Sequence, residues 1–423
     1  MNVEQLKRII NEQREEIDYR FGKWKLVERE LPKERVLEYL KAPNILAVLG
    51  VRRCGKTTFS LMLERERCGY VNFDDERMIG IEAEELNDVL QALYELHGPE
   101  MEYIILDEIQ NVAGWELFAN RLRRTKKVIV TGSNSKLLAG ELATHLTGRY
   151  MDFTLFPFSF REFLKLKEQE VDVYSTASIA EAKNALRQYL KTGGFPEAHL
   201  LGSGMVSRIY GDIIQKDILR RHRIRRERQF FDFARYLVSN FSKEITFRKT
   251  ANVTSLGNIH TIRKYVGYLE SSYLVFLINR FSFKLKEQMK APKKVYCIDT
   301  GIVNSMAFRF SEDMGRIMEN VVAVELMRRN AYVGGGSLFY WKDHQQREVD
   351  FVVKSNGSVG RLIQVSDASS RVDIEDREIK SLVLASDQLR CRNLMMITWD
   401  FEGEVDSVEC VPLWKWLLKP RGP

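Results

Sequence analysis

The stretch that decides the fold is Gly50-Val51-Arg52-Arg53-Cys54-Gly55-Lys56-Thr57-Thr58. It matches the pattern GxxxxGK[ST], follows the apolar run 44–49 and precedes a helical run that starts near residue 59. In this context glycines let backbone N–H groups curl around phosphates, the lysine reaches the β- and γ-phosphates, and the next hydroxyl ligates Mg²⁺. The pattern predicts a nucleoside triphosphate site, with the binding residues Gly50, Arg53, Cys54, Gly55, Lys56, Thr57 and Thr58.

A second motif lies at residues 103–108, where four apolar residues end in two carboxylates, Asp107 and Glu108. We expect Asp107 to hold Mg²⁺ together with Thr57, and Glu108 to orient and polarise the attacking water. Asn134 follows the next apolar strand and is expected either to sense the γ-phosphate or to cap the following helix. Arg149 is expected either to act as an arginine finger, in the same chain or in a neighbouring one, or to pair with a surface acid.

Short apolar strands alternate with helical stretches from residue 44 onward, at residues 44–49, 70–73, 103–106, 127–131 and 150–155. This alternation predicts a parallel sheet with helices on both faces. A strand separates the phosphate loop from the acidic strand along the chain, which indicates the additional-strand class of P-loop ATPases. Hydrolysis by an activated water is therefore favoured.

The patterns divide the chain into five predicted domains. Residues 1–43 form a lead-in helix, residues 44–157 the P-loop ATPase core, and residues 158–228 a helical lid around the turn Gly193-Gly194-Phe195-Pro196. Three helices and a hairpin at residues 229–300 predict a winged helix-turn-helix. Residues 301–423, a long helix at 312–329 followed by strands, predict a separate α/β domain.

Composition narrows the cellular setting. The 423 residues carry a formal net charge of +7, which favours acidic partners such as nucleic acid. The longest apolar runs are far shorter than the ~18–20 residues that cross a bilayer, and no signal peptide is recognised at the start. The five cysteines form no CxxC pair, so neither zinc nor disulfides are expected. We expect a cytoplasmic protein with no membrane contact.

These residues resemble archaeal and bacterial predicted ATPases of the AAA superfamily, which pair an AAA domain with a winged helix and a C-terminal domain formerly of unknown function. The resemblance extends over nearly the whole chain. It implies binding of ATP and Mg²⁺, slow ATP hydrolysis, a lid, a winged helix and a nuclease-like tail. Besides the phosphate loop, it rests on residues 70–75, 106–110, 115–116, 131–134, 147–149, 156–163 and 193–197.

The C-terminal stretch 348–353, followed by 362–366, is similar to the core hairpin of PD-(D/E)xK nucleases. In an active site of that kind Asp350 and the residue at 364 bind Mg²⁺, a lysine two residues later stabilises the attacking hydroxide, and Glu319 or Glu325 adds an acid. This chain has Gln364 and Ser366 at the last two hairpin positions. We therefore expect a nuclease-like fold without cleavage, used to dock nucleic acid or a partner.

The predicted winged helix has two interpretations, direct DNA contact or packing between domains. The DNA interpretation depends on two polar sets of residues that suit phosphate contacts beside a groove. The recognition helix carries Asn258, His260, Thr261, Arg263 and Lys264, and the wing carries Lys284, Lys286, Lys290, Lys293 and Lys294.

The sequence thus predicts an α/β protein with a P-loop sheet of the additional-strand class, a helical lid, a winged helix and a nuclease-like C-terminal domain. The predicted function is a Mg²⁺-dependent ATPase that works as a nucleotide-gated switch associated with DNA. Two alternatives stay open, a DNA-binding regulator that holds nucleotide with little turnover and an ATP-gated nuclease. A protein partner or self-association is also compatible with the sequence.

Overall fold

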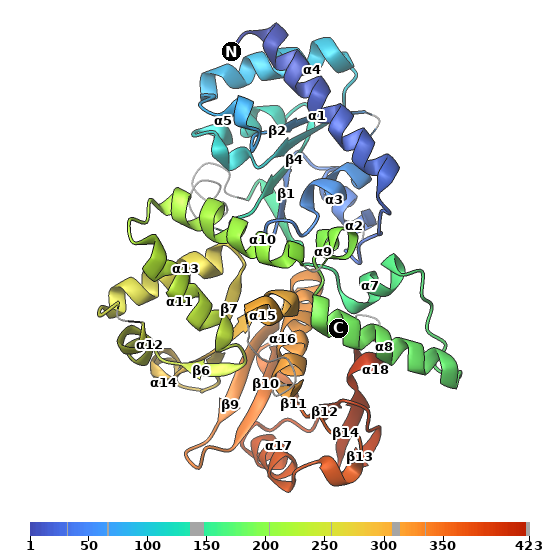
Figure 1. Cartoon of the computed structure of the whole chain (residues 1–423), viewed down its shortest axis with the longest axis vertical. Helices are drawn as coiled ribbons and strands as arrows, with labels where there is room; N and C mark the ends of the chain where they lie inside the picture. The colour runs from blue at the N-terminus through green and yellow to red at the C-terminus, as the bar shows by residue number, and fades with distance from the viewer. Residues whose placement is uncertain are drawn as a thin grey trace. The chain divides into compact units, whose positions relative to one another are not determined.

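The computed structural model describes residues 1–31, 33–65, 67–135, 148–202, 204–254, 256–306, 314–334 and 336–419. It contains two compact units, shown in Figure 1. Unit 1 comprises residues 1–156 and 271–273, and unit 2 comprises residues 157–270 and 274–423. Thr147 of the 147–149 motif and residues 312–313 of the predicted long helix lie outside the described residues. The five predicted domain ranges stay predictions.

Unit 1 is built on a five-stranded sheet with the order β2-β3-β4-β1-β5, in which all neighbouring strands are parallel. β4 lies between β1 and β3, so the predicted additional strand is confirmed. The strands are apolar and mostly buried, as expected for a parallel sheet covered on both faces. Their bounds are β1 (Ile45–Leu49), β2 (Cys68–Asn72), β3 (Tyr103–Asp107), β4 (Lys127–Gly132) and β5 (Tyr150–Thr154).

The N-terminal segment is part of this unit rather than a detached lead-in. It holds two helices, α1 (Val3–Lys23) and α2 (Lys33–Tyr39). Leu6, Ile9 and Ile10 on one face of α1 belong to the same apolar core as β1, β3 and β4, and this spacing gives a helix one buried stripe. The other α-helices in the described part of unit 1 are α3 (Lys56–Leu63), α4 (Leu86–His97) and α5 (Trp115–Leu122).

Unit 2 begins with helices, as predicted for residues 158–228. The GGFP turn separates α8 from a short helix, α9, that the sequence did not indicate, and a π-helical turn, Ile213–Arg220, extends α10. The helices are α7 (Phe160–Leu166), α8 (Thr176–Thr192), α9 (Pro196–Leu201), α10 (Gly204–Asp212), α11 (Glu227–Ser239), α12 (Phe247–Val253), α13 (Ile259–Ser271), α14 (Leu285–Lys290), α15 (Thr300–Met306), α16 (Met314–Val333), α17 (Asp376–Leu389) and α18 (Leu413–Leu418).

A nine-stranded mixed sheet runs through the rest of unit 2, with the order β13-β14-β12-β11-β10-β9-β7-β8-β6. The two strands of the predicted wing, β7 and β8, pair antiparallel, and β7 also pairs parallel with β9. The wing strands therefore continue the sheet of the C-terminal residues. The bounds are β6 (Lys243–Ile245), β7 (Val275–Arg280), β8 (Lys293–Cys297), β9 (Gly336–Lys342), β10 (Glu348–Ser355), β11 (Ser358–Val365), β12 (Leu394–Thr398), β13 (Gly403–Val405) and β14 (Val408–Pro412).

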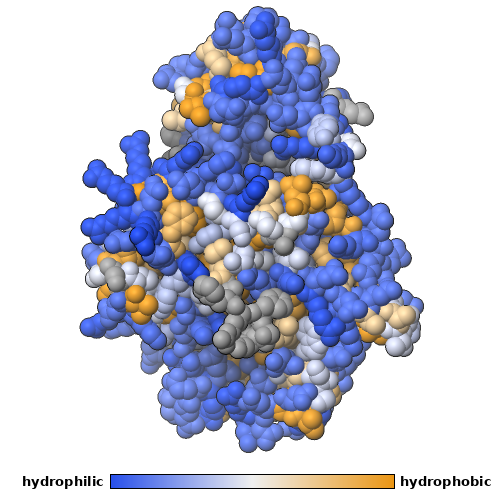
Figure 2. Space-filling model, viewed as in Figure 1, coloured by the Kyte–Doolittle hydropathy of each residue, from blue (hydrophilic) through white to orange (hydrophobic). Residues whose placement is uncertain are grey.

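The face of the molecule shown in Figure 2 is mostly polar. Hydrophilic residues cover most of the face seen in Figure 2, and apolar residues form smaller patches among them. Among the described helices, none combines the length and the apolar content that a membrane span requires.

Candidate functional site

The predicted phosphate loop lies at the carboxyl end of β1, and two of its glycines are required by geometry. Gly50 has φ +148°, and a Cβ at this position would lie 2.1 Å from the carbonyl oxygen of Leu155. Gly55 has φ +98° in the left-handed region and precedes the first residue of α3, Lys56. Because a side chain is disfavoured in both places, the loop backbone can turn tightly into the N-terminus of α3.

Lys56 is buried inside this loop. Its Nζ lies 3.2 Å from the carbonyl oxygen of Gly50 and 3.3 Å from that of Val51. The same atom lies 3.3 Å from Oε1 of Glu108, so the two predicted catalytic motifs form an ion pair. The ammonium therefore lies inside the loop that is predicted to hold the phosphates.

Asp107, at the end of β3, accepts hydrogen bonds from side chains of α3, β2 and β4. Its Oδ2 accepts hydrogen bonds from Thr57 Oγ1 at 2.7 Å and from the Tyr70 hydroxyl at 2.8 Å, and its Oδ1 accepts one from Thr131. Burial, and after it the neighbouring Glu108 carboxylate, raises the pKa of Asp107. Hydroxyl and carboxylate oxygens are the ligands that Mg²⁺ prefers, so these residues fit the predicted metal.

Glu108 has a left-handed backbone, φ +52° and ψ +40°, a conformation that costs energy in a residue other than glycine. Its N–H donates to Thr131 Oγ1 at 3.0 Å, and its Oε2 accepts from the Ser133 N–H at 3.2 Å. Burial opposes ionisation, but the positive charges of Lys56 and Arg52 outweigh it and lower the pKa of Glu108 to about 2. The carboxylate is thus charged and aimed at the loop.

The other predicted binding residues occupy different positions around the loop. Cys54 is buried, and burial raises the pKa of its thiol. Thr58 lies in the first turn of α3, and Arg53 is exposed with φ +67°. Asn134 is buried just beyond the carboxyl end of β4, on the edge of the sheet that carries the loop. Its role as a γ-phosphate sensor stays a prediction.

Arg149 is not brought to this site within the chain. Its carbonyl accepts a hydrogen bond from the N–H of Ile45, at the amino end of β1. Burial, and after it the positive charge of Arg149, lowers the pKa of Arg123. The phosphate loop begins at the other end of β1, five residues away, or about 16 Å at the usual rise of a strand. A finger role for Arg149 within one chain is therefore not supported, and the role stays a prediction only for a neighbouring copy.

Two residues near the site were missed by sequence reasoning. Arg29, in the extended segment between α1 and α2, donates from Nη1 to the carbonyl of Cys54 at 2.9 Å and from Nη2 to that of Phe156 at 2.5 Å. Tyr70 reaches Asp107 from the neighbouring strand β2. Residues 24–32 have no periodic pattern, and a tyrosine in an apolar strand is ordinary, so nothing local indicated either contact.

The nuclease-like residues of unit 2 do come together. Gln364 Oε1 accepts from the N–H of Asp350 at 3.3 Å, and Asp350 Oδ2 accepts from the N–H of Val365 at 3.0 Å. Glu319, on α16, reaches the same place, and burial, followed by the Asp350 carboxylate, raises its pKa to about 8. Glu325 does not join them, because it pairs with the arginines one turn further along α16.

The predicted wing is only partly an exposed basic surface. Under the DNA interpretation Lys294 belonged to the set suited to phosphate contacts, but its side chain is buried, so the structure does not place it for such a contact. Lys284, Lys286 and Lys290, on or beside α14, are exposed, and Lys293 is half-buried. On the predicted recognition helix Thr261 is half-buried and the other four polar residues are exposed.

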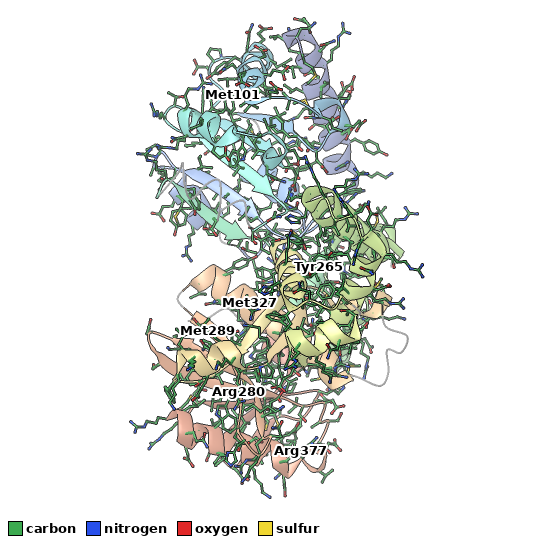
Figure 3. All side chains as sticks on the ribbon, turned by 90° about the vertical axis from the view of Figure 1, so that its left-hand side faces the viewer. Met101, Tyr265, Arg280, Met289, Met327 and Arg377 are labelled. Atoms are coloured by element: carbon green, nitrogen blue, oxygen red, sulfur yellow. The ribbon has the colours of Figure 1, made fainter. Side chains whose placement is uncertain are left out.

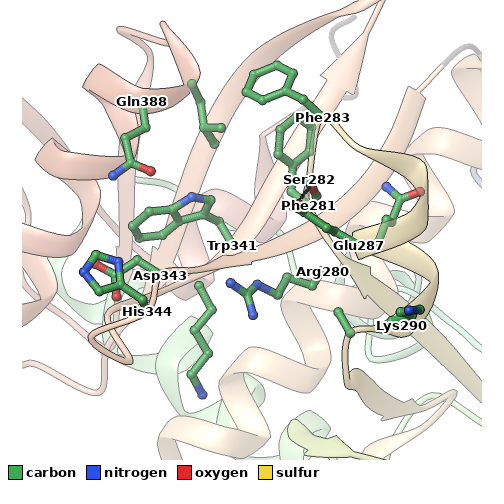
Figure 4. A pocket seen from close by; sticks show the side chains of 14 residues that line it. Arg280, Phe281, Ser282, Phe283, Glu287, Lys290, Trp341, Asp343, His344 and Gln388 are labelled. Atoms are coloured by element: carbon green, nitrogen blue, oxygen red, sulfur yellow. Dashed lines mark hydrogen bonds between the residues drawn. The ribbon is translucent and has the colours of Figure 1, made fainter.

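A pocket with a volume of about 640 Å³ lies beside the basic residues of α14 in unit 2. Figure 4 shows aromatic and cationic side chains around it, and Figure 3 labels Arg280 at the end of β7 and Met289 on α14. Two carboxylates, Glu287 and Asp343, also line it, and the latter is paired with Arg347. The aromatic and cationic lining residues are Arg280, Phe281, Phe283, Lys290, Trp341, Lys342 and His344.

Three family matches cover most of the chain. An AAA domain matches residues 42–164, a domain of unknown function (DUF8612) matches residues 183–313, and another (DUF4143) matches residues 314–416. The AAA match contains both motifs around Lys56 and Asp107, so sequence comparison and site geometry agree on this part of the chain.

Full-length relatives are found among archaea and bacteria. The uncharacterized protein MJ1544 of Methanocaldococcus jannaschii is 36% identical over 91% of this chain and 90% of its own length. An uncharacterized protein of Haemophilus influenzae is 26% identical over 93% and 99% of the two chains. A solved structure, the STAND-type signal transduction ATPase of Pyrococcus horikoshii, aligns at 14% identity over 73% of this chain and 48% of that one, with a TM-score of only 0.26.

Proposed function

Because the chain contains an AAA domain and belongs to the same family as its relative MJ1544, we propose that it is a Mg²⁺-dependent ATPase that works as a nucleotide-gated switch. The observation that carries the proposal is the convergence of Lys56, Asp107 and Glu108 at one edge of the unit 1 sheet. A regulator that only holds nucleotide has no need of a buried, charged carboxylate beside the P-loop lysine. The presence of Glu108 at this position therefore favours ATP hydrolysis over mere binding of the nucleotide.

The ion pair between Lys56 and Glu108 gives the switch a physical basis. Besides its contacts with the carbonyl oxygens of Gly50 and Val51, the lysine ammonium has two classes of charged partner, the Glu108 carboxylate and the phosphates of ATP. When the phosphates take the ammonium, Glu108 loses the charge that most strongly lowers its pKa. Its carboxylate then becomes a better acceptor for the proton of the attacking water. Nucleotide binding and activation of the base are thereby coupled.

The residues around Asp107 would bind the metal. Thr57 Oγ1 and the Asp107 carboxylate would hold Mg²⁺, and the ion would neutralise the charge on the phosphates. Tyr70 and Thr131 keep the carboxylate of Asp107 oriented. In the proposed switch, the presence or absence of the γ-phosphate changes how the winged helix and the C-terminal domain of unit 2 are presented to a partner.

Association with nucleic acid is proposed as the output of this switch. It is supported by the net charge of +7 and by the pocket beside α14, where Arg280 and Lys290 stand near Phe283 and Trp341. Cations for phosphates and aromatic faces for bases are the combination that single strands require. The exposed residues of α13 offer phosphate contacts to a duplex as an alternative.

The experiment that tests the proposal measures ATP binding and Mg²⁺-dependent phosphate release, with and without single-stranded and duplex DNA. Lys56→Ala should abolish both activities. Lys126→Ala should retain them, because this lysine contacts the carbonyls of Pro99 and Met101 and the ring of Tyr94 at the other end of the sheet. If neither single-stranded nor duplex DNA changes the rate of ATP hydrolysis, a protein partner becomes the proposed target of the switch. Wild-type affinity for ATP in Lys56→Ala would refute the site itself.

A further inference from the structure

The acidic centre of unit 2 already contains a cation that belongs to the protein. Lys294 Nζ lies 2.9 Å from Asp350 Oδ1, 3.0 Å from Glu319 Oε1 and 2.5 Å from Glu348 Oε1. The lysine side chain is 3% exposed. Three carboxylates around one buried ammonium is the arrangement expected when the protein itself supplies the counter-charge.

The sheet explains how this lysine reaches the centre. Lys294 lies on β8, and Asp350 lies on β10. The strands β7 and β9 lie between β8 and β10 in the sheet. The Lys294 ammonium lies 5.8 Å from the ring centroid of Tyr340 on β9. Tyr296, two residues along β8, donates its hydroxyl to Glu319 Oε1 at 2.6 Å. Since residues i and i+2 share one face of a strand, β8 delivers both groups to the same side of the sheet.

The residues at the positions of the metal ligands in a nuclease of the resembled type are not suited to bind a metal ion. A nuclease of the resembled type needs carboxylates that face an open cation position and a lysine at the second residue after the third carboxylate. Here position 364 is an amide and position 366 a hydroxyl. Within the described part of the chain, no three acidic, histidine or cysteine side chains lie together in a way that could hold a metal ion.

A second lysine adds positive charge to this network. Lys342 Nζ lies 3.1 Å from Glu348 Oε2 and 2.9 Å from Glu244 Oε2, which brings a carboxylate from β6 into the same network. Two ammonium groups therefore stand against four carboxylates, and each carboxylate oxygen that faces Lys294 is already used. A divalent cation would have to displace an ammonium that is almost completely buried.

We propose that Lys294 occupies the position that a divalent cation takes in a nuclease of this fold, so that unit 2 has a metal-free centre that binds the sheet together and does not cleave DNA. The inference is independent of the ATPase proposal, because every residue involved lies in unit 2. It also gives the buried Lys294 a role other than DNA contact.

The test uses the full chain and Mn²⁺ binding measured by electron paramagnetic resonance without nucleotide. Wild type and Asp350→Asn should bind the same number of ions. Lys294→Ala should bind one more than wild type, and Mn²⁺ should restore much of the melting temperature that this variant loses in EDTA. The double variant Lys294→Ala/Asp350→Asn should neither bind the extra ion nor recover. Lys293→Ala, at the neighbouring half-buried position, should behave as wild type.

Two results would overturn the proposal. The first is an ion bound by the wild type and lost in Asp350→Asn, which would make the centre a metal site. The second is Mg²⁺-dependent nicking of DNA by the wild type that Lys294→Ala abolishes, because Lys294 would then be the relocated lysine of an active nuclease. The first result does not depend on the folding of Lys294→Ala, since Asp350→Asn alone distinguishes the metal-free centre from the metal site. In the second, Mg²⁺-dependent nicking by the wild type already contradicts a centre that does not cleave DNA.

Discussion

Replacing Tyr70 by phenylalanine removes one hydrogen bond and little else. The ring is kept, so no cavity forms, but Asp107 Oδ2 loses the donor at 2.8 Å and keeps Thr57 and Thr131 as donors to the carboxylate. Hydrogen bonds to charged groups contribute about 1.5–3 kcal/mol. Because two donors remain, we expect the lower end, about 1.5 kcal/mol, which corresponds to roughly a tenfold change in an equilibrium constant.

Native-state hydrogen exchange of the β3 amides measures this loss in unit 1, and phosphate release measures its effect on turnover. We expect β3 exchange to quicken by about tenfold and hydrolysis to slow by a similar factor if the Tyr70 bond is also made in the transition state. The matched control is Tyr103→Phe at the other end of β3, whose hydroxyl meets only the ammonium of Lys127 at 3.2 Å. Equal effects of the two substitutions would refute the assignment of Tyr70 as the residue that orients Asp107.

Three further predictions concern both units. Gly194→Ala should destabilise unit 2 by about 1–3 kcal/mol in urea unfolding, because its Cβ would lie 2.3 Å from the carbonyl oxygen of Phe158, whereas Gly211→Ala, with open space around its Cβ, should be neutral or stabilising. Burial raises the pKa of Asp299 to about 6. A raised carboxyl pKa gives stability that is present below its unfolded value near 3.8 and is lost as the pH rises through about 6, so Asp299→Asn should flatten the pH dependence of unfolding in that window. Arg29→Met should weaken ATP binding about tenfold in a titration, because the phosphate loop loses a charge-assisted bond at its carbonyl, and an unchanged affinity would mean that Arg29 only joins the loop to the end of β5.

The sheet of unit 1 and most of its site followed from the sequence because the determinants are local. A glycine-rich loop between a strand and a helix, and an apolar strand that ends in two acids, place Lys56, Asp107 and Glu108 by spacing alone. The carboxyl ends of parallel strands meet at one edge, so the convergence of these residues was expected.

The contacts that the sequence did not reveal are made between segments far apart in the chain. Arg29 and Tyr70 reach the site from an irregular segment and from a neighbouring strand, and neither position has a pattern of its own. Lys294 looked like part of a basic wing because its neighbours are lysines. Its burial became visible only with the pairing of β7 with β9 and of β9 with β10, which joins the wing strands to the strand of Asp350. The position of Arg149 likewise depends on the direction of β5, which no local motif contains.

Glu108 performs the central step of the proposed mechanism, the activation of the attacking water. The decisive measurement is single-turnover hydrolysis of Mg²⁺-ATP by the wild type, by Glu108→Gln and by the control Glu102→Gln, a glutamate that pairs with Lys127 away from the loop. Glu108→Gln should lose at least about a hundredfold in rate while it binds ATP as tightly as the wild type or more tightly, because Lys56 no longer has a carboxylate to leave. Undiminished hydrolysis by Glu108→Gln, or an equal loss in Glu102→Gln, would contradict the proposed mechanism.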